Sequence, residues 1–284
     1  MSAADCVHAR YGRRASAPVA LAAGWWSRAY AFTLDGREAV IRFGRYAEDF
    51  RKDEIMGCLT RLAPRVLEIG EASDGYFCAS ERAYGVHLDD VDEAGMRLVL
   101  PALLATLDEL SRIEPPGPGY GGWDATGTAP YASWAEALLA VNEENPRMPG
   151  WRARLTPSAA RAFAEGYAAL RDAAAGLPDV RRIIHSDLLN RNVLVDGPRI
   201  TALLDWGCGM YGDPLYDLAW LSYWWPWYPQ WAGIDIEQAL AADGRRTRAY
   251  GLHIGLAHIA WSAFTGNVEH LARNALQVTH LVQG

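Results

Sequence analysis

The chain has 284 residues, half of them hydrophobic, and a formal net charge of −7 at pH 7. This length suffices for one large domain or two lobes. The absence of any run of Lys or Arg argues against nucleic acid as a partner. The N-terminus lacks the apolar core of a signal peptide, and no apolar run is long enough to span a bilayer. The sequence therefore predicts a cytoplasmic protein with no membrane attachment.

The four cysteines are scattered along the chain and include no CxxC pair, which argues against a zinc site. We expect them to be free thiols in a reducing compartment. They are Cys6, Cys58, Cys78 and Cys208.

The first third of the chain has the pattern of a small α+β lobe. Its segments are expected to form strand, strand, helix, strand and strand, at residues 29–34, 39–43, 50–62, 66–69 and 76–80. The dipeptides Asp35-Gly36 and Asp74-Gly75 are turn signals between the two strands of each pair. On the helix, Ile55, Leu59 and Leu62 are expected to form the apolar side.

After Tyr84-Gly85 the pattern becomes helical. Apolar residues recur at helical spacing in residues 95–113, 131–142 and 157–175, and again from Leu215 to the end. Two short strands, 193–195 and 200–204, interrupt the helices and meet at the turn Asp196-Gly197. The sequence thus predicts a β-rich N-terminal lobe, residues 1–83, and a larger, mostly helical C-terminal lobe, residues 84–284.

The chemistry is carried by two short motifs, H-S-D-L-L-N-R-N at residues 185–192 and D-W-G at residues 205–207. Together they form the H-x-D-x-x-x-x-N and D-x-G arrangement of kinases. Phosphoryl transfer needs an acceptor hydroxyl held in line and divalent cations that neutralise the phosphates. We therefore predict that Asp187 accepts the hydroxyl proton and that Asn192 and Asp205 are oxygen ligands of Mg²⁺. Each residue alone could be an ordinary cap or turn residue, and it is their joint spacing that indicates catalysis.

These motifs, together with G-D-P-L-Y-D-L-A at residues 212–219, resemble the aminoglycoside phosphotransferase family. The resemblance extends over nearly the whole chain and is strongest to the hygromycin B phosphotransferases of that family. It implies a protein-kinase-like bilobal fold and transfer of the γ-phosphate of ATP or GTP, with Mg²⁺, to a hydroxyl of a small cationic sugar-like antibiotic. It also implies that Asp213 and Asp217 brace the catalytic loop and that His185 packs within it.

Two departures from protein kinases favour a small-molecule substrate. Ser186 stands where protein kinases carry an Arg that grips an activation-loop phosphate. Asp213 follows so soon after Asp205 that little chain is left for a regulated activation loop or a peptide platform.

The nucleotide-binding part lacks a G-x-G-x-x-G loop, and its first turn offers Gly24 and then Ser27. Arg42 stands where kinases carry their lysine, and its guanidinium can fork onto phosphate oxygens. We predict Glu54 as its acidic partner, with Asp53, which faces about 100° away on the helix, as the second choice. By resemblance, the hinge that reads the base through backbone groups consists of Ser80, Glu81, Arg82 and Ala83.

The acceptor site is less well marked. Trp225 and Trp227 are candidates for stacking on a sugar face, although tryptophans at this spacing are usually core residues. Asp235 and Glu237 are acids that could meet substrate amino groups.

Two other functions remain open from the sequence. One is a housekeeping kinase for choline, a sugar or a related metabolite. The other is a nucleotide-binding pseudokinase, against which the intact Asp187, Asn192 and Asp205 argue. We expect a monomer.

Overall fold

The computed structural model describes residues 2–23, 27–240 and 244–283. The chain forms two compact units. The first consists of residues 1–106, 123–128 and 187–209, and the second of residues 107–122, 129–186 and 210–284. The predicted catalytic and metal-binding residues belong to the first unit.

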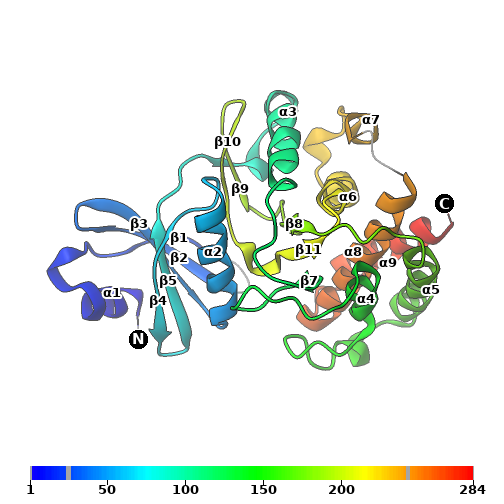
Figure 1. Ribbon diagram of the computed structural model, residues 1–284, viewed down its shortest axis with the longest axis horizontal. Helices are drawn as coiled ribbons and strands as arrows, with labels where there is room; N and C mark the ends of the chain where they lie inside the picture. Colours follow the sequence, from blue (N-terminus) through cyan, green and yellow to red (C-terminus); the bar gives the residue numbers. More distant parts are fainter. Residues whose placement is uncertain (1, 24–26, 241–243, 284) are drawn as a thin grey trace. The chain divides into compact units, whose positions relative to one another are not determined.

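A five-stranded antiparallel sheet forms the body of the first unit, with strand order β1-β2-β3-β5-β4. In Figure 1 these strands are coloured from blue to cyan. Their bounds are β1 Val19–Ala23, β2 Ser27–Leu34, β3 Arg37–Gly44, β4 Val66–Ala72 and β5 Gly75–Glu81. The β2–β3 hairpin closes at Asp35-Gly36, both with positive φ, as the sequence predicts.

The second hairpin of this sheet is shifted by one residue from the prediction. Its turn residues are Ser73 and Asp74, and Gly75 already pairs with Ala72 as the first residue of β5. Gly75 has a φ of 132°, and a Cβ there would lie 2.4 Å from the carbonyl oxygen of Gly44. The glycine is therefore required by the close approach of β3, and not by the turn.

Neither helix α1 nor strand β1, both near the N-terminus, was predicted. Helix α1, Ala3–Tyr11, begins with a capping box in which Ser2 and Asp5 exchange hydrogen bonds. Its buried residues, Cys6, Val7 and Tyr11, pack against the sheet core around Phe32. The helix is stabilised by this packing, which its short sequence of small, apolar and charged residues does not indicate.

Helix α2, Ala47–Leu59, confirms the predicted helix but presents a different face to the protein. Phe50, Lys52, Asp53 and Met56 are buried, whereas Leu59 is 37% exposed. The predicted apolar side was therefore wrong. Two charged residues lie on the buried face because they bind the chain after Asp205, as described below.

A second, three-stranded sheet carries the catalytic loop, with order β10-β9-β6. Its strands are β6 Val86–His87, β9 Val193–Asp196 and β10 Arg199–Leu203. The β9–β10 hairpin is confirmed, but Asp196 pairs with Arg199, so the turn lies at residues 197–198. A short 3-10 helix, η2 Leu88–Asp90, follows β6, and helix α3, Glu93–Leu110, comes next.

The second unit is mainly helical (Figure 1). Its helices include α4 Trp134–Leu139, α5 Pro157–Ala174, α6 Leu215–Trp224, α7 Ile236–Leu240, α8 Gly244–Thr265 and α9 Val268–Gln283. A small sheet, order β7-β11-β8, consists of Gly121–Gly122, Met210–Gly212 and Arg182–Ile184. The core lies where α5, α8 and α9 meet, and a Cβ at Gly255 would lie 2.4 Å from Val278. The predicted α+β class, strands first and helices after, is confirmed.

Within the described ranges, we find no helix with the length and apolar character needed to cross a membrane.

Candidate active site

The carboxylate of Asp187 is held by two side-chain amides from its own loop. The Nδ2 group of Asn190 donates to Oδ1 at 2.7 Å, and that of Asn192 donates to Oδ2 at 3.0 Å and to the backbone oxygen of Asp187 at 2.8 Å. Enclosure by the surrounding protein raises the pKa of Asp187 well above its usual range, opposed by the Asn190 hydrogen bond. The nearby Asp205 carboxylate adds to the rise. The group is thus fixed in orientation and suited to accept a proton.

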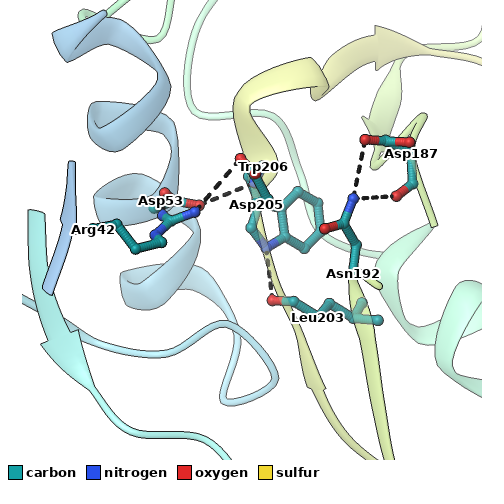
Figure 2. Close-up of polar contacts among 7 residues, drawn as sticks. All are labelled: Arg42, Asp53, Asp187, Asn192, Leu203, Asp205 and Trp206. Carbon is teal, nitrogen blue, oxygen red and sulfur yellow. Dashed lines mark hydrogen bonds and ion pairs between the residues drawn. The ribbon is translucent and has the colours of Figure 1, made fainter. Parts of the chain in front are cut away.

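Asn192 and Asp205 form an oxygen pair that fits Mg²⁺. Because the Nδ2 of Asn192 donates to Asp187, its Oδ1 is the amide atom available for a cation. Figure 2 shows this oxygen on the side facing Asp205. Asp205 has a left-handed backbone, φ 58°, and its side chain is 42% exposed. One carboxylate and one amide oxygen leave positions for phosphate oxygens and water, as a Mg²⁺–nucleotide site requires.

The acidic partner of Arg42 is Asp53, and the prediction of Glu54 was wrong. Arg42 forms an ion pair with the buried Asp53, and its Nη1 lies 3.6 Å from Asp205 Oδ1 (Figure 2). Glu54 instead pairs with Arg51 on the solvent side of α2. Although burial disfavours the charged form, Asp53 and Asp205 raise the pKa of Arg42, which stays cationic.

Helix α2 also holds the segment after Asp205. Asp53 Oδ1 accepts the backbone N–H of Trp206 at 3.0 Å. Lys52, only 7% exposed, donates from Nζ to the carbonyl oxygens of Gly207 at 2.9 Å and Gly209 at 3.3 Å. Neighbouring residues of opposite charge therefore bind an N–H and two carbonyls of one short turn. Sequence analysis did not identify Lys52, because a lysine on a helix usually faces solvent.

A cavity of about 410 Å³ lies in the first unit and is lined in part by residues predicted to bind the nucleotide. Its lining includes predicted residues Ser27, Arg42, Ser80, Glu81, Arg82 and Ala83. It also includes Asn190, Asn192 and Asp205. Gly24 lies outside the described residues. The predicted nucleotide-binding residues and the predicted metal ligands thus line one cavity, large enough for a small ligand.

The catalytic loop has a further support that the sequence did not reveal. Asp89 accepts the backbone N–H groups of Asn190 and Arg191, and Asp90 forms a two-fold hydrogen bond with the Arg191 guanidinium. These acids lie about a hundred positions earlier in the chain, and no local pattern marks them.

In the second unit, the D-P-x-x-D motif has the predicted bracing role. Asp217 accepts the backbone N–H groups of His185 at 2.9 Å and Ser186 at 2.8 Å, directly before Asp187 in the chain. Burial raises the pKa of Asp217 to about 7, against the effect of these two donors. Asp213 is bound by Arg246 and by the Tyr250 hydroxyl. His185 is fully buried, consistent with a packing role.

Trp225 is placed in the core. It is 6% exposed and its ring centroid lies 4.9 Å from that of Trp231, so the predicted sugar contact is corrected to a packing role. Trp227 is half-buried, and the Arg273 guanidinium lies 3.7 Å above its ring. Asp235 caps α7 through the N–H of Gln238, and Glu237 accepts the Ser222 hydroxyl. Both acids are exposed, and together with Trp227 they remain predicted acceptor contacts.

Comparison with known proteins identifies the family. A model of the phosphotransferase enzyme family matches residues 19–252, most of the chain. This protein belongs to the phosphotransferase enzyme family. The phosphotransferase is 31% identical over 262 residues to hygromycin-B 4-O-kinase of Escherichia coli. The aligned region covers 89% of this chain and 76% of that relative.

Solved structures give the same fold for the phosphotransferase. A thermostable mutant of aminoglycoside phosphotransferase APH(4)-Ia, in a ternary complex with AMP-PNP and hygromycin B, matches with a TM-score of 0.88 and 30% identity. That match covers 100% of this chain and 98% of the other. The GDP complex of aminoglycoside 2'-phosphotransferase-IIIa matches with a TM-score of 0.63 and 17% identity, over 98% and 96% of the two chains. The predicted kinase-like fold is confirmed.

Proposed function

We propose that this phosphotransferase transfers the γ-phosphate of ATP to a hydroxyl of hygromycin B or a close aminoglycoside. The observation that carries the proposal is the joint occurrence of two features. Asp187, Asn192 and Asp205 are all present, Asp187 accepts hydrogen bonds from Asn190 and Asn192, and Asp205 lies near Arg42. In addition, the chain is 31% identical to a hygromycin-B 4-O-kinase and 30% identical to an aminoglycoside phosphotransferase solved in complex with hygromycin B. The adenine nucleotide analogue AMP-PNP in the second of these relatives favours ATP over GTP as the phosphate donor.

In the proposed reaction the acceptor hydroxyl oxygen attacks the γ-phosphorus, and the bond from that phosphorus to the β–γ bridging oxygen breaks. Asp187 takes the hydroxyl proton, and the nucleoside diphosphate leaves with the bond electrons. Arg42, kept cationic by Asp53 and Asp205, binds phosphate oxygens. Asn192 and Asp205 would hold Mg²⁺, which supplies neutralisation of the phosphate charge when bound.

The consequence for the cell would be antibiotic resistance. A phosphate monoester adds about −1.5 to −2 charges at neutral pH, by analogy with phosphorylated side chains. This addition would weaken the attraction of a cationic drug for an anionic target. We place the reaction in the cytoplasm, with a monomeric enzyme and no nucleic-acid or membrane partner.

A coupled assay for nucleoside diphosphate release across an aminoglycoside panel tests the proposal. We expect release that depends on hygromycin B or a close aminoglycoside and that falls by about 10²–10⁴ in the Asp187→Asn variant, the typical contribution of a general base. Release driven by choline or a simple sugar, and by no aminoglycoside, would replace the antibiotic with a metabolite as acceptor. Absence of transfer to every acceptor, with nucleotide still bound, would favour the pseudokinase reading.

A further inference from the structure

The turn between Asp187, the proposed base, and Asn192, the predicted metal ligand, has an unfavourable backbone conformation. Asn190 and Arg191 are consecutive non-glycine residues with φ of 65° and 68°. Left-handed backbone is disfavoured for residues with a Cβ, and two in succession persist only where the surroundings fix them. The conformation of this turn therefore needs an external support.

Asp89 supplies this support through both of its carboxylate oxygens. Oδ1 accepts the N–H of Asn190 and Oδ2 accepts the N–H of Arg191, each at 3.0 Å. Asp89 lies in the 3-10 helix η2, directly after strand β6, and β6 pairs with β9 of the catalytic hairpin. Asp89 is thus anchored to the same sheet as the turn whose N–H groups it binds.

The turn determines where the two amides on Asp187 lie. Asn190 donates from its side chain to Asp187 Oδ1, and Asn192, one residue after the turn, donates to Oδ2. If the turn relaxed to a right-handed backbone, the side chain of Asn190 would point elsewhere, and the Asn192 amide would shift with the chain. A displacement of about 1 Å in a reacting group can lower a rate by about 10².

We propose that Asp89 is a positioning residue for phosphoryl transfer, acting through the backbone of Asn190 and Arg191 to fix the Asp187 carboxylate. The inference rests on the proposed function for its reaction, but the arrangement itself is independent of the acceptor. The neighbouring Asp90 binds only the exposed side chain of Arg191, and exposed pairs contribute little. The positioning role is therefore specific to Asp89.

Steady-state kinetics of Asp89→Ala, Asp89→Asn and Asn190→Ala test this role. Asp89→Ala should lower kcat by about 10- to 100-fold because orientation of the base is lost, and the accompanying shift of Asn192, a predicted Mg²⁺ ligand, should raise the KM for nucleotide by a smaller factor. The kcat of Asp89→Asn should lie between those of Asp89→Ala and the parent enzyme, since the single amide oxygen of Asn replaces two carboxylate oxygens that each accept one N–H group. The loss in the Asp89→Ala, Asn190→Ala double variant should be much smaller than the product of the two single losses, because both act on Asp187 through one path.

A matched control separates positioning from folding. Asp92, three residues further on, is exposed and accepts the N–H of Gly95 at the start of α3. Asp92→Ala should lower thermal stability, as loss of a cap does, and keep kcat within about twofold. Full kcat in Asp89→Ala, an equal kcat loss in Asp92→Ala, or independent losses with Asn190→Ala would each overturn the proposal.

Amide hydrogen exchange keeps the result distinguishable from a failure of the proposed function. In the folded protein, the peptide covering residues 187–192 should exchange faster in Asp89→Asn than in the parent enzyme, and unchanged exchange would contradict the hydrogen bonds to Asp89. If the parent enzyme modifies no aminoglycoside, the proposed acceptor is wrong. The kinetic comparison then uses nucleotide hydrolysis with water as acceptor.

Discussion

At the residue scale, the ion pair between Arg42 and Asp53 has two consequences. It keeps Arg42 directed toward the cavity, and it competes with Asp205, whose Oδ1 lies 3.6 Å from the same guanidinium. Without Asp53, we expect Arg42 to bind Asp205, the predicted metal ligand. We therefore expect Asp53 to keep Asp205 available as the predicted metal ligand and Arg42 available for the predicted phosphate contact.

Asp53→Asn should raise the KM for nucleotide by about tenfold or more, because a charge-assisted bond contributes about 1.5–3 kcal/mol. Steady-state kinetics at varied ATP measure this change. The matched control is Glu54→Gln, which alters an adjacent acid that pairs only with Arg51 at the surface and should have little effect. Equal effects of the two substitutions would contradict the assignment of Asp53.

The two predicted metal ligands, Asp205 and Asn192, should differ in their contribution to Mg²⁺ affinity. Asp205→Ala should reduce the apparent Mg²⁺ affinity by more than the 10–100-fold typical of outer-shell changes, because a carboxylate ligand is lost. Asn192→Ala should be milder and partly rescued by added Mg²⁺, as a neutral amide contributes less. Titration of activity with Mg²⁺ measures both, and equal losses that Mg²⁺ does not affect would speak against the ligand roles.

Sequence predicted Asp187, Asn192 and Asp205 because their spacing relative to two short strands is itself the signature. Asp53 was ranked below Glu54 because the direction of a side chain on a helix depends on which face packs, and Ile55 and Leu59 indicated the wrong face. Asp89 could not be found, since its partners are backbone N–H groups in a distant turn.

At the scale of elements, helix α2 joins strand β3, which carries the predicted phosphate contact Arg42, to the turn that carries Asp205. Asp53 contacts both, and Lys52 donates to the carbonyls of Gly207 and Gly209. The Lys52 ammonium also lies 5.1 Å from the Trp123 ring centroid. The helix therefore positions Asp205, the predicted metal ligand, through the backbone that follows it.

Lys52→Met should lower the apparent Mg²⁺ affinity by about 10–100-fold, the usual effect of losing an outer-shell partner. Titration of activity with Mg²⁺, beside thermal unfolding, measures the change. Arg51→Met is the control on the same helix, because Arg51 lies at the surface and pairs with Glu54. If both variants needed the same Mg²⁺ concentration as the parent enzyme, Lys52 would have no part in holding the turn.

The strands and long helices followed from alternation, helical spacing and turn dipeptides, while one turn shifted by a residue because its glycine serves packing. Gly75 illustrates this point, since its missing Cβ makes room for Gly44 of β3. Helix α1 escaped prediction because only three of its residues, Cys6, Val7 and Tyr11, are buried against the sheet. Packing between distant segments is not encoded in local sequence patterns.

At the scale of the whole molecule, the stability of the second unit should depend on pH through His253. Burial lowers the pKa of His253 to about 4, and Tyr216 contacts its Nδ1 at 2.8 Å. An unfolded histidine titrates near about 6.5. The unfolded chain therefore binds the proton more readily, so this contribution to the free energy of unfolding is complete above about pH 6.5 and declines as the pH falls toward 4.

Chemical denaturation followed by tryptophan fluorescence, at pH values from 7 to about 4.5, measures this decline. His253→Gln removes the titrating group and should reduce the dependence of unfolding free energy on pH, while His280→Gln, at an exposed position of α9, should keep it. The same slope in all three proteins would show that His253 does not contribute to acid destabilisation.

The central claim, transfer of a phosphoryl group to an aminoglycoside hydroxyl, is tested most directly on the product. Hygromycin B is incubated with the purified protein, ATP and Mg²⁺, and the recovered drug is analysed by mass spectrometry and phosphorus NMR. The account predicts a mass increase of one phosphoryl group, a phosphate-ester signal coupled to a drug proton, and neither with Asp187→Asn. If hygromycin B and other aminoglycosides were recovered unmodified after incubation with the protein, and the protein were shown to bind ATP, the claim would be contradicted.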